Sequence, residues 1–312
     1  MCFRHCCLFA VLAFLHLTPA YPGTLDSAAE FYLDPDSSPA VWVRNHPDDP
    51  RAASIARSIA GVPMARWFGN WSGDVQGAVQ QYVDRADAAH RVAILVAYDI
   101  PGRDCAGASA GGAVDAPAYR SWIDAFSLGI AGRNAVVIVE PDATAQLGCT
   151  HNPDERLALL RYAISRLRLN APAAKIYLDG GNAHWIAAEV MATRLNAAGL
   201  QEAKGFALNV SNFYTTSQST AYAAAVNAAL LSQFGYTKPF AVDTSRNGNG
   251  SDGQWCNPYG RKIGAPAGVI SDSMLSLWIK VPGNSDGPCG SAASSPAGVF
   301  SPELALHLID GT

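Results

Sequence analysis

Four aspartates lie where short apolar runs of this sequence end, or in the loops that follow them. Asp142 closes "AVVIVEPD", Asp179 lies in "YLDGG", Asp104 lies in "YDIPGRDC" and Asp286 lies in "NSDG". Cleavage of a glycosidic bond needs one carboxylic acid to protonate the leaving oxygen and, usually, a second carboxylate to activate water or attack the sugar. A single loop aspartate is more often a turn or N-cap residue. Four of them at corresponding positions indicate acid–base chemistry.

Tryptophans accompany these acids. Trp67, Trp185 and Trp255 lie at or just after ends of the apolar runs, where the flat face of an indole can stack on a sugar ring. We therefore predict that these three side chains are sugar platforms. Trp71 is placed similarly, whereas Trp278 lies inside an apolar run, where core packing explains it equally well.

Short β-rich runs alternate with stretches of helical periodicity along the chain. In "PDERLALLRYAISRLRL", for example, leucine and isoleucine recur every three or four residues and arginines fill the other face. The predicted strands are Val62–Phe68, Val92–Asp99, Ala135–Asp142, Lys175–Gly181, Gly205–Asn212, Pro239–Ser245 and Leu275–Pro282; the predicted helices are Asp74–His90, Pro153–Leu169, Ala187–Ala198 and Thr220–Phe234.

This alternation predicts a parallel sheet with right-handed crossovers. The fold we expect is α/β: a distorted (β/α) barrel of about seven parallel strands, similar to a TIM barrel, because polar residues gather at the carboxyl ends of several different strands. An open doubly wound sheet usually carries a glycine-rich phosphate turn. The nearest candidate, "GASAGG" at 107–112, opens no helical pattern, which disfavours a dinucleotide site.

Composition limits the classes of function. The chain has 312 residues, 49% of them hydrophobic, with 26 acidic and 22 basic residues and no basic run, which disfavours nucleic acid and anionic membranes as partners. Residues 1–20 have the basic start, apolar stretch and small-residue end of a secretory signal peptide, so we expect a secreted, extracellular protein. No linker divides residues 21–312, so we interpret them as one catalytic domain. We also expect a monomer. No metal or organic cofactor is implied.

Four cysteines remain once residues 1–20 are set aside: Cys105, Cys149, Cys256 and Cys289. An even number in an oxidising compartment predicts two disulfides, for which three pairings exist. Free buried thiols are the alternative. Zinc is disfavoured because no two of the four form a Cys-x-x-Cys pair.

Seven motifs follow one another along the chain: "YDIPGRDC", "VIVEPD", "YLDGGNAHW", "LNVSNF", "VDTSRNGNG", "WCNPYGRKIG" and "LWIKVPGNSDG". In this order they resemble the consecutive motifs of glycoside hydrolase family 6, the secreted inverting cellulases. The resemblance runs from "FYLDPDSSPA" at 31–40 to "SPELAL" at 301–306, almost the whole chain after residue 20.

The resemblance implies roles for the acids. Asp142 would be the general acid, Asp104 a second carboxylate that supports it, and Tyr98 a side chain that presses on the distorted sugar ring. Arg103 and Asp179 would support this group. A neighbouring carboxylate at Asp104 would raise the pKa of Asp142 and so keep its proton in place.

Asp286 matches the proposed base of the family. The resemblance implies that Lys280 and Arg246 hold it, and that it takes the proton either directly or through a chain of waters. Two cations would lower the pKa of Asp286 and keep it charged. Glu140, two residues before the acid, we interpret as structural and hydrogen-bonded under the strand end.

Further residues follow from the resemblance. The cysteines match the family's pairs, Cys105 with Cys149 and Cys256 with Cys289. Asn284 and Asn182 stand where the family usually has glutamate and histidine, so sugar contacts there can differ. Gly102 stands where the family often has aspartate, which can loosen that loop. The expected sugar-binding residues are Trp67, Trp185, Trp255, Lys280, Asn212 and Asn284.

The short segment between Trp255 and Lys280 favours an open cleft and internal cleavage, hence an endo-β-1,4-glucanase acting on β-1,4-glucan or cello-oligosaccharides. An exo-acting cellobiohydrolase is the alternative. A catalytically weak carbohydrate-binding homologue is disfavoured because all the proposed catalytic carboxylates are present. A retaining glycosidase would need its two carboxyl groups about 5–5.5 Å apart.

Overall fold

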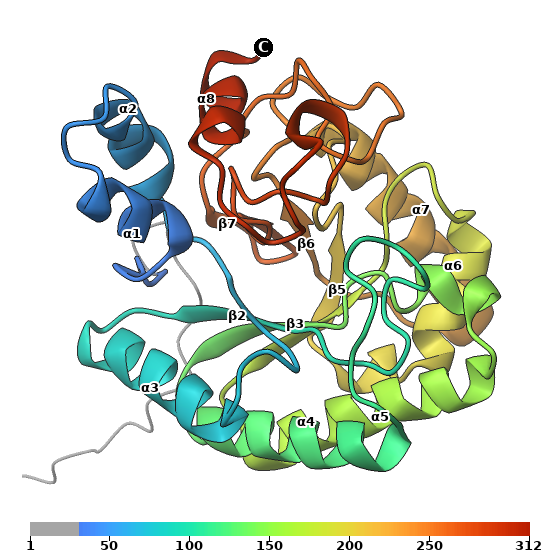
Figure 1. Cartoon of the computed structure of the whole chain (residues 1–312). Helices are drawn as coiled ribbons and strands as arrows, with labels where there is room; N and C mark the ends of the chain where they lie inside the picture. Colours follow the sequence, from blue (N-terminus) through green and yellow to red (C-terminus); the bar gives the residue numbers. More distant parts are fainter. Residues whose placement is uncertain (1–30) are drawn as a thin grey trace, which may run out of the picture.

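A strongly curved sheet of eight strands forms the centre of the computed structural model, which describes residues 31–312 (Figure 1). The expected signal peptide at 1–20 lies outside the described residues. Seven strands are parallel and neighbour one another in the order β1-β2-β3-β4-β5-β6-β8, and β7 pairs with β8 antiparallel. The strands are β1 (Arg66–Phe68), β2 (Ala93–Ala97), β3 (Ala135–Val139), β4 (Lys175–Asp179), β5 (Gly205–Leu208), β6 (Phe240–Asp243), β7 (Gly268–Ser271) and β8 (Met274–Leu277).

The sheet curls toward a barrel without a strand ladder between β1 and β8 in the described residues. The gap is bridged by the main-chain N–H of Ala65, which donates to the carbonyl of Trp278 at 2.8 Å, and by the indole N–H of Trp67, which donates to the carbonyl of Ile279 at 2.8 Å. The predicted α/β fold, a distorted barrel of about seven parallel strands, is confirmed.

Helices cover the outer side of this curve, where Figure 1 shows those from α3 to α7 in succession. α3 begins after the N-cap Asp74, α5 after the N-cap Asn152, and α7 after Thr215 in a capping box with Gln218, so the polar residues before each helical pattern satisfy its first N–H groups. The helices are α1 (Ser38–Asn45), α2 (Ala52–Ile55) continued by a π turn (Ala56–Ala60), α3 (Val75–Ala88), α4 (Ala116–Ile130), α5 (Pro153–Asn170), α6 (Ala188–Ala197), α7 (Thr216–Phe234) and α8 (Pro302–Asp310), with short 3₁₀ turns at Ala145–Cys149, Leu200–Glu202 and Gly290–Ala292.

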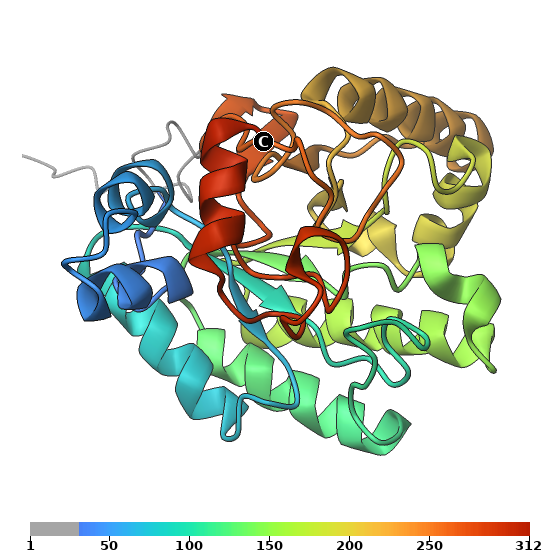
Figure 2. The ribbon, with the colours of Figure 1, turned by 45° about the horizontal axis from the view of Figure 1, so that its top comes forward.

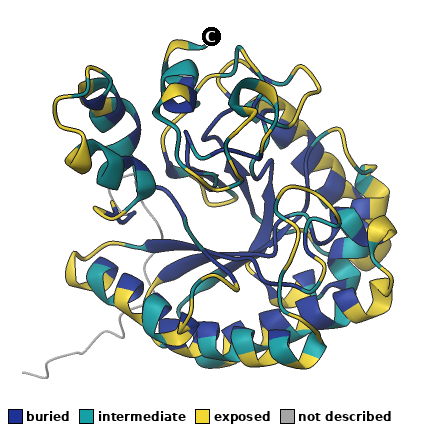
Figure 3. Cartoon of the chain, viewed as in Figure 1, coloured by how far each residue is buried: buried dark blue, intermediate teal, exposed yellow. Residues whose placement is uncertain are grey.

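The sheet is buried on both faces (Figure 3). Alternate residues of β2 and β3 enter two different clusters: Leu95 and Val137 pack against the outer helices, whereas Val96 and Ile138 fill the interior of the curve. This period of two follows from the pleat of a strand. Because both faces need apolar side chains, the strands read as continuous apolar runs.

A third cluster closes the open side of the barrel. Trp278 is 1% exposed there, packed with Ile55, Met64 and Ala305, where α2 and α8 lie side by side (Figure 2). Trp278 is thus a core residue. No helix in residues 31–312 combines the length and the apolar character needed to cross a membrane.

Several elements are not among the predicted ones. β7 is short and Ile270 in it is 60% exposed, so it lacks the apolar pattern of a buried strand. α4 does have helical spacing, at Tyr119, Ile123, Phe126 and Ile130. Six of the seven predicted strands run past the observed ones at their carboxyl ends, where the chain turns away to place the site. The first, Val62–Phe68, ends with β1 at Phe68 but begins four residues too early.

Candidate active site

One cavity of about 510 Å³ lies at the carboxyl ends of the parallel strands and brings together Asp104, Asp142 and Asp286. These acids come from three separate loops, after β2, β3 and β8. The predicted residues Tyr98, Trp67, Trp185, Trp255, Asn212 and Lys280 also line this cavity.

Asp142 is half-buried and takes the left-handed conformation, with φ of 70°. Its main-chain N–H donates to Oδ2 of Asp179 at 2.9 Å. Burial raises the pKa of Asp142 well above its usual range, and the negative charges of Asp179 and Asp104 raise it further, against a smaller opposing effect of Lys280. The surroundings of Asp142 therefore favour its protonated form.

Asp179 lies fully buried behind this acid and does not line the cavity. Its Oδ2 also accepts the main-chain N–H of Gly181 at 3.0 Å. Burial raises the pKa of Asp179 to about 7, and Asp243 adds to this, while the two N–H donors oppose it. Asp179 is thus a buried carboxyl that orients the end of β3.

Asp104 stands on the loop after β2, next to Cys105, which is bonded to Cys149. Its Oδ2 accepts the main-chain N–H of Ser109 at 2.7 Å, and its Oδ1 lies 3.4 Å from the side-chain nitrogen of Gln146. The carboxylate is therefore fixed by its own loop while it faces the cavity.

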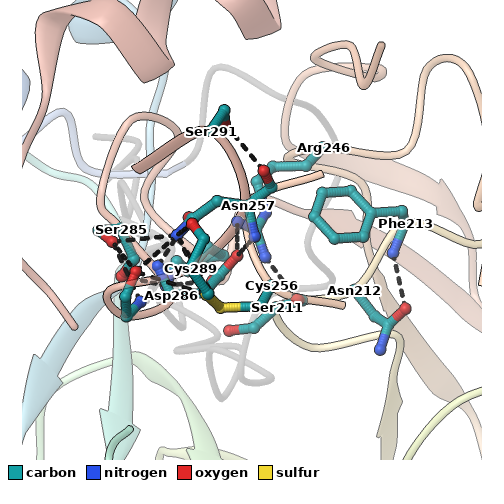
Figure 4. A network of polar contacts seen from close by, with 12 residues as sticks. Ser211, Asn212, Phe213, Arg246, Cys256, Asn257, Ser285, Asp286, Cys289 and Ser291 are labelled. Atoms are coloured by element: carbon teal, nitrogen blue, oxygen red, sulfur yellow. Dashed lines mark hydrogen bonds and ion pairs between the residues drawn. A yellow bond between two sulfur atoms is a disulfide. The ribbon is translucent and has the colours of Figure 1, made fainter. Parts of the chain in front are cut away.

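Asp286 is held by two cations, Lys280 and Arg246, and Figure 4 shows Arg246 beside it. Oδ2 lies 2.8 Å from Nη1 of Arg246, and Oδ1 lies 2.9 Å from Nζ of Lys280. Burial alone would raise the pKa of this carboxyl, but Arg246 and Lys280 outweigh it and lower the pKa to about 2. The surroundings of Asp142 and Asp286 thus displace their pKa values in opposite directions. Arg246 itself is buried outside the cavity.

Glu140 is completely buried and points away from the cavity. Its carboxyl oxygens accept the main-chain N–H groups of Asp99, at 3.0 and 3.1 Å, and of Ile100 at 3.0 Å. Burial raises the pKa of Glu140 to about 8, although these hydrogen bonds oppose the rise. The residue ties the end of β2 to the end of β3, which fits the expected structural role.

A second cavity, of about 590 Å³, adjoins the first and shares Trp67, Tyr98, Ser109 and Lys280 with it. Two predicted residues, Arg103 and Asn284, line this second cavity and not the one that holds the acids. The two cavities together form a cleft across the strand ends.

Arg103 links the walls of this cleft. Its guanidinium lies 4.9 Å from the ring of Trp71 and 5.0 Å from that of Tyr98, and it donates to the carbonyls of Tyr98 and Ser109 at 3.1 and 2.9 Å. Asn284 accepts a hydrogen bond from the hydroxyl of Ser38 at 2.7 Å. Both side chains are therefore ordered by protein contacts.

The tryptophans of the cleft are open to solvent. Trp71, Trp185 and Trp255 are 55%, 42% and 57% exposed, so no loop within residues 31–312 covers them. Trp67 is half-buried and meets Tyr98 edge to face at 5.2 Å. Flat apolar faces thus line the cleft along its length.

Some residues of the first cavity are absent from the sequence-based set. His184 and Tyr214 stack there with ring centroids 4.6 Å apart, although they come from different loops. His184 precedes the predicted platform Trp185, and this adjacency is the signal that could have found it. Gln146, Ser251 and Gln254 also line the cavity, and their types carry no such signal.

Backbone strain concentrates around the cleft. A left-handed φ is uncommon in residues other than glycine, and such residues cluster at functional sites. Nine non-glycine residues in the described part of the chain have it, and seven of them lie in segments that line or hold the first cavity: Asp104, Cys105, Glu140, Asp142, Asn209, Ser211 and Asn257.

The remaining predictions concern cysteines and metals. The structure joins Cys105 to Cys149 and Cys256 to Cys289, the pairing that the resemblance implied. No group of three or more histidine, cysteine, aspartate or glutamate side chains within residues 31–312 is arranged to hold a metal ion.

Comparisons with known proteins agree on one family. A family model described as glycosyl hydrolases family 6 matches residues 26–311. Endoglucanase 1 of Streptomyces halstedii is 51% identical, covering 96% of this chain and 95% of that protein, and endoglucanase A of Cellulomonas fimi is 42% identical over 89% of this chain and 60% of that protein. The solved structure of the endoglucanase Cel6 from Mycobacterium tuberculosis, in complex with methyl-cellobiosyl-4-deoxy-4-thio-β-D-cellobioside, superposes with a TM-score of 0.83 at 38% identity, covering 93% of this chain and 98% of that one.

Proposed function

This chain belongs to glycosyl hydrolase family 6, and from that membership we propose that it is an endo-β-1,4-glucanase that cleaves β-1,4-glucosidic bonds of cellulose and related β-glucans with inversion. The observation that carries the mechanism is that Asp142 and Asp286 line one cavity with their pKa values displaced in opposite directions. Two carboxyl groups in such different environments can serve as acid and base at the same pH.

Asp142 is the general acid in this proposal. Its raised pKa keeps the proton on the carboxyl until the glycosidic oxygen needs it. Asp104 faces the same space as a carboxylate and supports both the proton on Asp142 and the positive charge that develops on the sugar. Tyr98, at the junction of the two cavities, contacts the ring that is being distorted.

Asp286 is the base that activates water. Its pKa of about 2 leaves it charged above that pH, where the raised pKa of Asp142 still favours a proton there, so Asp286 can polarise a water on the far side of the sugar. The two cations that keep it charged also weaken its pull on a proton. The proton of the attacking water therefore passes either to Asp286 directly or through a chain of waters, as the resemblance allowed.

The glucan lies along the cleft formed by the two cavities. Trp185 and Trp255 stack on sugar rings at one end and Trp67 at the other, while Lys280, Asn212 and Asn284 contact hydroxyls. The exposure of the tryptophans supports internal cleavage, because a chain can enter an unroofed cleft from the side.

The proposal extends to the setting of the enzyme. We infer export by the signal peptide at 1–20, one catalytic domain over 21–312 and a monomer. The two disulfides support an oxidising compartment.

Defined substrates test the proposal. The enzyme is expected to cleave cellohexaose internally, with the α-anomer appearing first in the proton NMR spectrum, and to lower the viscosity of carboxymethylcellulose steeply for each reducing end released. A slow fall in viscosity with cellobiose as the first product would favour the exo alternative. A β-anomer as the first product would contradict inversion.

A further inference from the structure

Asn257 lies behind the proposed base and outside both cavities (Figure 4). It follows Cys256 on the long loop after β6 and is only 4% exposed. Its φ of 42° is left-handed, a conformation that asparagine, aspartate and glycine adopt most readily. Because Asn257 does not line the cleft, it has no route to the substrate, and what it does must act through its neighbours.

Asn257 and Asp286 exchange two hydrogen bonds. The main-chain N–H of Asn257 donates to Oδ2 of Asp286 at 3.1 Å, and the main-chain N–H of Asp286 donates to Oδ1 of Asn257 at 2.9 Å. The carboxylate and the backbone of Asp286 are thus both attached to one residue. Arg246 and Lys280 supply the charge, whereas Asn257 supplies a main-chain donor that cannot rotate away as a long side chain can.

The amide nitrogen of Asn257 holds the residues on either side of Asp286. Nδ2 donates to the carbonyl of Gly287 at 2.8 Å and to the hydroxyl of Ser285 at 3.2 Å. The carbonyl of Asn257 accepts from Ser291, from its main-chain N–H at 3.0 Å and its hydroxyl at 2.8 Å. Only an amide side chain provides an acceptor for one N–H and donors for neighbouring oxygens from a single position.

We propose that Asn257 is a positioning residue for Asp286: its reciprocal hydrogen bonds set the direction of the base carboxylate toward the cleft. The inference rests on the proposed role of Asp286 and adds to it a residue that carries no charge and touches no sugar. Misplacing a catalytic group by about 1 Å can cost on the order of 100-fold in rate, so the loss of this support should appear in the chemical step.

Two substitutions separate the parts of this role. Asn257→Gly keeps the left-handed backbone and the N–H donor to Asp286 but removes the side chain. We expect kcat to fall about 10–100-fold with KM changed less than about threefold. Asn257→Asp keeps an oxygen for the N–H of Asp286 but places a second carboxylate beside it, which raises the pKa of Asp286. The acidic limb of the kcat/KM profile should then move up by about one pH unit.

A matched control is available at Asn227. The side chain of this asparagine also makes two hydrogen bonds with one residue: Nδ2 donates to the carbonyl of Lys238 and Oδ1 accepts its main-chain N–H, both at 2.9 Å. Asn227 lines neither cavity. Asn227→Ala and Asn227→Asp should lower the melting temperature without moving the pH profile of the folded enzyme. They calibrate what the loss of a structural asparagine does by itself.

The outcomes distinguish a positioning role of Asn257 from a purely structural one, and both from a failure of the proposed function. Wild-type hydrolysis of cellohexaose with unchanged kcat in Asn257→Gly, or an unmoved acidic limb in a folded Asn257→Asp, would overturn the positioning role and leave the proposed function intact. An Asn257 variant that fails to fold at 25 °C would assign the residue a purely structural role and overturn the inference as well. Absence of hydrolysis by the wild-type enzyme would instead defeat the proposed function.

Discussion

The main-chain N–H of Asp142 donates a 2.9 Å hydrogen bond to Oδ2 of Asp179, so the buried carboxyl at the end of β4 orients the acid at the end of the neighbouring strand β3. Two carboxyl groups placed together in this way influence each other's protonation. In the proposed mechanism, this contact lets a residue that does not line the cavity influence the pH range of the reaction.

Replacement of Asp142 by asparagine should abolish most of the hydrolysis. Asparagine fits the left-handed backbone and keeps the hydrogen bond to Asp179 but cannot donate a proton to the leaving oxygen. We expect kcat on cellohexaose to fall about 10²–10⁴-fold. Calorimetric titration with cellotetraose should show retained binding, and turnover near that of the wild type would remove Asp142 from the acid's role.

Replacement of Asp179 by asparagine should shift the alkaline limb of activity downward. The negative charge of Asp179 raises the pKa of Asp142, so its removal lowers that pKa and the proton is lost at a lower pH. Asparagine can still accept the N–H groups of Asp142 and Gly181 through its side-chain oxygen. The alkaline limb of the kcat/KM profile should move to lower pH by about one pH unit. A shift in the opposite direction would contradict the coupling.

Replacement of Glu140 by glutamine should stabilise the protein increasingly as the pH rises above about 4.5. The folded-state pKa of Glu140, about 8, lies above its usual value near 4.5. Between these two pH values the folded state keeps a proton that the unfolded state has lost, so the free energy of unfolding of the wild type falls as the pH rises. Glutamine never ionises and keeps an acceptor for the N–H groups of Asp99 and Ile100.

For the Glu140→Gln variant, denaturant unfolding at two pH values provides the measurement. We expect similar free energies of unfolding for the variant and the wild type at pH 5, and an advantage of about 1–2 kcal/mol for the variant at pH 8. An advantage that is equal at both pH values would exclude the ionisation of Glu140 as its cause.

Removal of the Cys256–Cys289 disulfide should affect both stability and catalysis. The two cysteines are 33 positions apart and flank the loop that carries Asn257 and the segment that carries Asp286. Replacing both by serine should lower the free energy of unfolding by about 2–4 kcal/mol, and should reduce kcat because the base loses part of its support. Calorimetry and cellohexaose kinetics on the folded variant measure the two effects. A folded variant with unchanged kcat would show that hydrogen bonds alone hold the loop.

The sequence by itself determined the alternation of strands and helices and the positions of the acids at or after strand ends. Both are local patterns: apolar runs of strand length, helical periods, and the polar residue that ends each run. Asp104, Asp142 and Asp286 could be named from the chain because parallel strands in a curved sheet bring their carboxyl ends to the same side.

Only the tertiary structure decided the environment of each group. It assigned Trp278 to the core, placed Asn284 and Arg103 in the second cavity, and revealed the contacts of Asn257 and the stacking of His184 on Tyr214. These facts join residues from distant parts of the chain. A pKa depends on burial and on charges a few ångströms away, and both arise only when separate loops meet over the sheet. The raised pKa of Asp142 and the lowered pKa of Asp286 are therefore properties of the fold, although both residues are visible in the sequence.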